Sequence, residues 1–91
     1  MARFRVLKWT VPVDDRPHPI GSGKVVLVDC QDGPDAVQVW TLEHDITAAI
    51  GPCNAQVFGT GQVLPEGVVN THLGSVATEA GLVWHLFEVL P

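Results

Sequence analysis

The fold is decided by residues 24–43, "KVVLVDCQDGPDAVQVWTLE", in which a turn separates two short apolar runs. The runs, 24–30 and 36–43, are rich in Val, which favours strands, and the second alternates with the period of two that strands have. Residues 31–35, "QDGPD", place Asp-Gly before Pro, which is typical of a turn. We therefore predict two strands, of which 24–30, apolar on both faces, is a buried central strand.

The same pattern of apolar runs and Gly/Pro/Asp clusters continues on both sides of this stretch. Further strands are predicted at residues 3–11, 54–58, about 67–77 and 81–90. The last two strands are joined by "TEAG", a tight hairpin turn, and the final strand is predicted to be central or covered. Between 44 and 52 the chain offers at most one helical turn, with Asp45 as its cap.

Six short strands with almost no helical period predict an all-β fold, a small antiparallel sandwich or barrel. At 91 residues the chain has no room for a second core, so 1–91 is predicted to be a single all-β domain. The "FGTG" at 58–61 fits this fold as a corner of the sheet. A phosphate loop would need a helix after the glycines, and Pro65 follows instead, with no Lys nearby.

Charge is scarce and unevenly distributed along the chain. The sequence is 46% hydrophobic and 16% charged, against about 25% charged in an average domain. Apolar surface is therefore expected to face another subunit or a partner, and a homo-oligomer is the simplest arrangement. All five Lys and Arg residues lie within residues 3–24, and the net charge is −5. Residues 25–91 contain no Lys or Arg. A stretch of this length without a basic residue argues against extended nucleic-acid binding.

The compartment is inferred from the N-terminal residues and the cysteines. The start, "MARFRVLKWT", has no apolar core run of a signal peptide, and the apolar runs are too short to span a membrane. Cys30 and Cys53 could pair in an oxidising compartment, but two buried free thiols are the favoured interpretation. These observations predict a soluble cytoplasmic protein.

The most specific polar stretch is "VPVDDRPHPI" at residues 11–20. If the protein has a ligand, we expect it at Asp14, Asp15, Arg16 and His18, because function collects on loops carried by rigid sheets. Two carboxylates and an imidazole would also suit a metal ion, but no second element offers a partner spacing. The favoured interpretation is a local Asx-type turn, with no metal and no cofactor.

No catalytic residues are predicted. His85, in "LVWHLFE", is interpreted as a buried, hydrogen-bonded histidine. A nucleophile pair of Cys30 or Cys53 with a histidine stays open, although neither cysteine has a recognisable nucleophile context. Thr60 and Ser75 lack a nucleophile-elbow pattern.

Taken together and in order, "VPVDDRPHPI", "VFGTGQVLPEG" and "GLVWHLFE" resemble a family of short, largely uncharacterised proteins of actinobacteriophages and their actinobacterial hosts. The resemblance spans nearly the whole chain and is weakest at about 42–54. It implies a small phage-type protein in the host cytosol. It carries over no catalytic residue.

Three functions are weighed. The first is a non-enzymatic protein that oligomerises and binds a host protein, whose basic patch would suit the acidic chain after residue 24. The second is a small-molecule binder, for instance a nucleotide-signal sponge, with its site near Asp14–His18 and its cations drawn from Arg3, Arg5, Arg16 or Lys24. The third is a metal-dependent enzyme using Asp14, Asp15 and His18.

Overall fold

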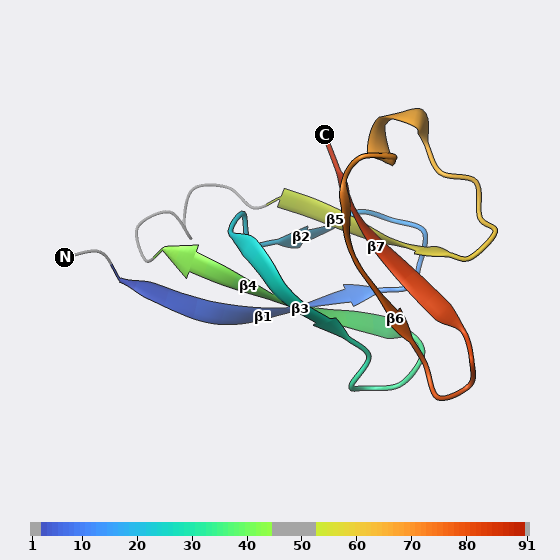
Figure 1. Cartoon of the computed structure of the whole chain (residues 1–91), viewed down its shortest axis with the longest axis horizontal. Coiled ribbons are helices and arrows are strands. Elements are labelled where there is room, and N and C mark those ends of the chain that lie inside the picture. Colours follow the sequence, from blue (N-terminus) through green and yellow to red (C-terminus); the bar gives the residue numbers. More distant parts are fainter. Residues whose placement is uncertain (1–2, 45–52, 91) are drawn as a thin grey trace.

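The computed structural model describes residues 3–44 and 53–90, which form two antiparallel β-sheets packed against each other (Figure 1). The strands are β1 (Phe4–Pro12), β2 (His18–Ile20), β3 (Lys24–Asp29), β4 (Ala36–His44), β5 (Cys53–Gly59), β6 (His72–Ala77) and β7 (Val83–Val89), with a 3₁₀ turn, η2 (Glu66–Val68), before β6. The first sheet has the order β1-β4-β3 and the second β2-β5-β7-β6. The prediction of an all-β sandwich is confirmed.

The main core lies between the two sheets and is built from alternate residues of their strands. Val37 and Val39 of β4 face Val57 of β5 and Leu86 of β7, and each is at most 2% exposed. Burying a side chain of this size stabilises the fold by about 1.5–3 kcal/mol. Because the period of a strand is two, the residues between these point away from the core, onto the outer faces of the sandwich.

The prediction that residues 24–30 form a buried central strand is wrong. β3 is an edge strand of its sheet, and the centre is occupied by β4. A β-bulge between Val25 and Leu27 adds one residue to β3, and Val26 and Leu27 are 47% and 51% exposed. The sequence of β3 is apolar on both sides because one side faces the core and the other forms an apolar outer surface.

Other strand predictions are confirmed or corrected in detail. β7 lies between β5 and β6, as predicted for the final strand. The "TEAG" turn is confirmed, with the Gly81 N–H donating to the Thr78 carbonyl at 3.0 Å and Gly81 at φ +87°.

β2 was not predicted, because its three residues lie in a Pro-rich stretch that was interpreted as a turn. The predicted strand from about 67 begins only at His72, after η2. The predicted helical turn at Asp45 lies outside the described residues.

The "FGTG" segment is a corner at the end of β5, as predicted. The Gln62 N–H donates to the Gly59 carbonyl at 3.1 Å, and Gly61 has φ +89°, which favours glycine. At Gly59 the need for glycine comes from close packing, because a Cβ there would lie 3.2 Å from Trp84 Cζ3. No helix follows Gly61 that could present converging amides to a phosphate.

The outer faces of the two sheets differ in how far other segments of the chain cover them. On the second sheet, Phe58 and Phe87 pack edge to face, with centroids 5.7 Å apart, and Val68 of η2 covers them. The segment between β5 and β6 thus folds back over its own sheet. Among the described residues, no comparable segment covers the outer face of β1, β4 and β3, where large apolar side chains stay exposed.

Candidate functional site

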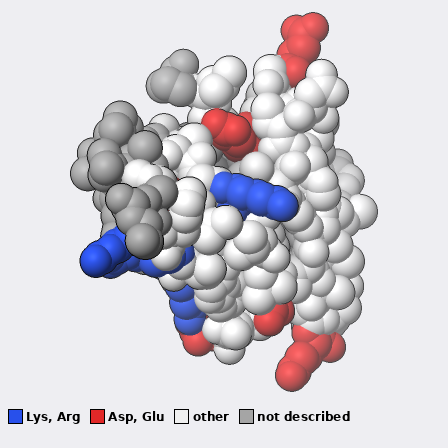
Figure 2. All heavy atoms as spheres, turned by 60° about the vertical axis from the view of Figure 1, so that its left-hand side comes forward, with Lys and Arg blue, Asp and Glu red and all other residues white. Residues whose placement is uncertain are grey.

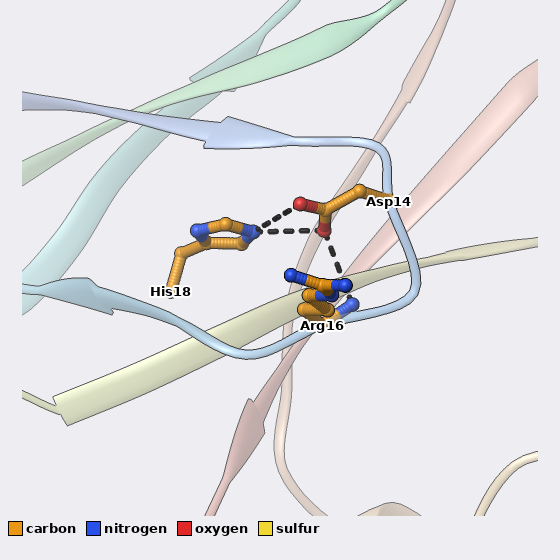
Figure 3. A network of polar contacts seen from close by, with 3 residues as sticks. All are labelled: Asp14, Arg16 and His18. Carbon is orange, nitrogen blue, oxygen red and sulfur yellow. Dashed lines mark hydrogen bonds and ion pairs between the residues drawn. The ribbon is translucent and has the colours of Figure 1, made fainter.

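The predicted ligand loop between β1 and β2 is held together by contacts within itself (Figure 3). Asp14 receives hydrogen bonds from the Arg16 backbone N–H at 3.1 Å and from His18 Nε2 at 2.8 Å. The bond from His18 is the main cause that holds the pKa of Asp14 below its usual value. This is the local Asx-type turn that the sequence predicts, with Arg16 and His18 folded onto one carboxylate.

Asp15 is turned away from the other residues of this loop. It adopts φ +61°, a conformation that Asp tolerates better than most residues, and its Oδ1 accepts a hydrogen bond from Gln62 Nε2 at 3.3 Å. Gln62 belongs to the glycine corner, and its Oε1 accepts from the Gly59 N–H at 3.0 Å. The structure therefore joins the two segments singled out in the sequence, the loop and the corner, through one glutamine side chain.

Three of the four predicted site residues, Asp14, Arg16 and His18, lie together, and Asp15 contacts the glycine corner instead. Asp14 and His18 form a pair, whereas Asp15 faces Gln62. Within residues 3–44 and 53–90, no group of three or more His, Cys, Asp or Glu side chains is arranged to hold a metal ion. The arrangement of this loop suits a structural turn that pins β1, β2 and the corner together.

A hollow of about 560 Å³ lies elsewhere, between the β3–β4 turn and the β6–β7 hairpin. Its lining includes the carboxylates of Asp29 and Glu79 and no Lys or Arg. Pro34, one of the lining residues, is held in place by the Trp84 Nε1–H, which donates to its carbonyl at 3.0 Å. Two carboxylates without a cation repel a phosphate, so this hollow does not suit the nucleotide ligand that the sequence left as an alternative.

The outer surface of the first sheet carries an apolar patch, which we call the open face. Its large exposed side chains are Phe4 at 61%, Val6 at 54%, Leu27 at 51%, Val26 at 47% and Leu42 at 39%. Sequence analysis anticipated exposed apolar surface from the composition, but did not locate it. It was missed because residues 24–30 were assigned to a buried strand.

The surface as a whole carries few charges, and most of the face in Figure 2 shows neither basic nor acidic side chains. On the open face, Lys8 Nζ lies 5.6 Å from the centre of the Trp40 ring, in a cation–π contact. The ring of Phe4 meets His44 edge-on, with centroids 5.0 Å apart. By register, Lys24 and Asp29 share this face at opposite ends of β3. The open face is thus apolar in the middle, with charges of both signs along β3.

A buried carboxylate that sequence analysis missed lies at the end of β4. Glu43 is 1% exposed, and its Oε2 accepts a hydrogen bond from the Gly23 backbone N–H at 2.8 Å. A Cβ at Gly21 or Gly23 would overlap this carboxylate. The signal in the sequence is the pair of glycines in "GSG" at 21–23, which sequence analysis did not connect with Glu43. Its role is to make room for Glu43.

Cys30 and Cys53 are free, as expected, but they are half-buried and not buried. Burial raises the pKa of both thiols, and the neighbouring Asp29 adds to the effect at Cys30. At Cys53 the carboxylate of Glu88 adds to it. A thiol whose pKa is raised is more fully protonated and therefore a weaker nucleophile than a thiolate.

The family model described as "Domain of unknown function (DUF7352)" matches residues 3–91. No curated protein and no solved structure matches. Among the described residues, no helix is long and apolar enough to cross a membrane.

Proposed function

The chain belongs to the DUF7352 family, and because that description carries no activity, we propose from the structure that the protein is a non-enzymatic interaction protein. It self-associates through the open face, and the oligomer binds a host protein. The observation that carries the proposal is the open face itself, with five large apolar side chains between 39% and 61% exposed. Apolar patches of this kind mark interaction sites on soluble proteins.

A second copy of the chain is the occupant that suits this face best. On the other sheet, η2 already covers the apolar part of the outer face, Phe58 and Phe87, so the chain buries this apolar surface itself and leaves the open face to a partner. A domain of about this size buries only a little over 60% of its unfolded surface, so an additional interface adds stability that the single chain lacks.

The charges on β3 fit a two-fold arrangement. Lys24 and Asp29 lie at opposite ends of this six-residue strand on the open face. Two copies that stack their open faces with the β3 strands antiparallel would place each Lys24 beside the other copy's Asp29. Such a contact is self-complementary, as a two-fold interface requires.

The host partner is proposed to present a basic surface. No Lys or Arg occurs after residue 24, and exposed carboxylates such as Glu66 and Glu79 lie on the second sheet's side of the chain. Opposite charges steer association and suppress wrong partners. From the resemblance noted above, we also propose that the protein is phage-encoded and acts in the cytosol of an actinobacterial host.

Self-association is tested by measuring the mass of the purified protein in solution. The chain has a mass of 9.8 kDa, and we expect a particle of at least twice that at micromolar concentrations. Leu27→Lys should shift the particle to the monomer, because it buries a charge in an apolar interface. The matched control is Val63→Lys, since Val63 is 89% exposed but lies outside the open face. A monomeric wild type, or a Leu27→Lys variant of unchanged mass, would refute the proposal.

The host partner requires a separate test. A protein captured from host lysate should be lost from Glu79→Lys bait and at high salt, while Glu79→Lys retains the oligomeric mass. If neither Glu79→Lys nor high salt reduces the capture, the proposal of a basic partner surface is contradicted. The proposal of self-association is not affected by this result.

A further inference from the structure

Four polar side chains form a chain of hydrogen bonds on the outer face of the second sheet, beside the glycine corner. His72 Nε2 lies 2.8 Å from Ser75 Oγ, and Ser75 Oγ lies 2.7 Å from His85 Nδ1. The other ring nitrogen of His85 lies 2.8 Å from Thr60 Oγ1. Two imidazole nitrogens from neighbouring strands thus approach one oxygen atom.

The cluster depends on an irregularity in β6. Ser75 lies directly opposite His85 in the β6–β7 register, so their side chains share a face. His72 is three residues from Ser75 and would point to the opposite face of a regular strand. The register shift between His72 and Gly74 absorbs one residue and brings His72 to the same side. Bulges of this kind re-aim a side chain, and here the result is a pair of histidines.

We propose that His72 and His85 form a binding site for a divalent transition-metal ion, with Zn²⁺ as the reference ion. Neutral imidazole suits Zn²⁺, Ni²⁺ and Cu²⁺, and binds through a nitrogen that carries a lone pair. Ser75 has a single hydroxyl hydrogen, so without metal it donates to one imidazole while the other imidazole donates its N–H to Ser75 Oγ. Metal binding moves that proton to the far nitrogen of the same ring, so that both nitrogens coordinate, and the Ser75 hydroxyl or water completes the coordination. With two imidazole ligands, the site binds more weakly than a structural zinc site, which has four protein ligands.

The surroundings orient both rings for this role. When His85 Nε2–H donates to Thr60 Oγ1, the lone pair is placed on Nδ1, the nitrogen that faces Ser75 and His72. The ring of His72 packs on Phe87, with centroids 5.1 Å apart, which limits its rotation. His72 and Ser75 are exposed and His85 is half-buried, so an ion reaches the pair from solvent without any opening of the fold.

The sequence predicted a buried, hydrogen-bonded His85, and the hydrogen bonding is observed while the burial is only partial. The alternative to a metal site is that the chain of hydrogen bonds only fastens β6 and β7 to the corner. The two interpretations differ in one respect. A purely structural network gives no reason for a metal ion to bind at these two residues.

The experiment is titration of the purified full chain with ZnCl₂ at neutral pH, followed by isothermal calorimetry and by the melting temperature. We expect one ion per chain and a melting temperature that rises with zinc. His72→Ala and His85→Ala should each abolish both effects. Thr60→Val should weaken binding by about tenfold, the low end of the loss seen when an outer-shell partner of a metal-bound histidine is removed.

His18→Ala is the control, because His18 lies in the β1–β2 loop and pairs with Asp14. It should bind zinc as the wild type does. Lowering the pH should release the ion, because imidazole must be neutral to bind it. Absence of binding by the wild type at millimolar zinc would overturn the proposal, and so would stoichiometric binding that persists in folded His72→Ala and His85→Ala variants. His72 is exposed, so its variant tests the site even if the His85 variant is unstable. The outcome is independent of the oligomeric mass.

Discussion

Replacing Gly21 by Ala should destabilise the protein through a single buried carboxylate. Gly21 is buried, and a Cβ there would overlap the Glu43 carboxylate and approach Thr41 Oγ1 to 2.9 Å. The end of a glutamate is usually flexible enough to move aside. Here it is 1% exposed and held by the Gly23 N–H at 2.8 Å, so moving it breaks that hydrogen bond in a buried site.

The expected cost combines two effects. Forcing extra volume into a packed site costs about 1–3 kcal/mol. Losing a hydrogen bond in a buried site costs about 1–3 kcal/mol. The two overlap, because movement of the carboxylate relieves part of the steric clash, so we expect a loss of about 3 kcal/mol. For a domain of this length, this corresponds to a fall in melting temperature of about 15 °C.

Urea unfolding of four variants tests this reasoning. In a Glu43→Ala background the same Gly21→Ala change should cost only about 1 kcal/mol, since the two nearest atoms, both of Glu43, are then absent. Gly67→Ala is the matched control: no atom lies within 4 Å of its added Cβ, and its stability should stay within about 0.5 kcal/mol of the wild type. The reasoning is refuted if Gly21→Ala resembles Gly67→Ala, or if its cost is the same with and without Glu43.

Two further changes address the segments singled out in the sequence. Gly59→Val should lower the free energy of unfolding by about 1–3 kcal/mol, because its Cβ would start 3.2 Å from Trp84 Cζ3, and an unchanged thermal melt would argue against the packed corner. Asp14→Asn should flatten the dependence of stability on pH in the acid range. The bond from His18 lowers the pKa of Asp14 below 3.8, so the folded state takes up this proton less readily than the unfolded chain. The stabilisation from the contact between Asp14 and His18 is present above pH 3.8 and is lost as the pH falls below it. An Asp14→Asn variant whose stability depends on acid pH as the wild type's does would contradict this contact.

The all-β architecture and most of the turns could be predicted because their signals are local. Gly81 and Gly61 have positive φ, and the turns they form are recognisable from neighbouring residues. The Asx-type turn at Asp14 is equally local, since its partners lie within four residues. The "FGTG" corner was interpreted correctly because no helix and no Lys accompany its glycines.

What the prediction missed depends on contacts between segments far apart in the sequence. Residues 24–30 have the composition of a central strand, and only the order of the sheet shows that β3 is an edge. The role of Gly21 and Gly23 is defined by Glu43, about twenty residues away. The link from Asp15 to Gln62 joins residues 47 positions apart.

The sequence by itself determined that this chain forms short antiparallel strands, because strand period and turn chemistry act over a few residues. Only the tertiary structure decided which apolar surface stays uncovered and which histidines meet. Both depend on register, and one added residue at Val26 or near Leu73 moves side chains from one face of a sheet to the other. Local strand propensity hardly changes with such a shift in register, whereas the packing of two sheets against each other depends on it.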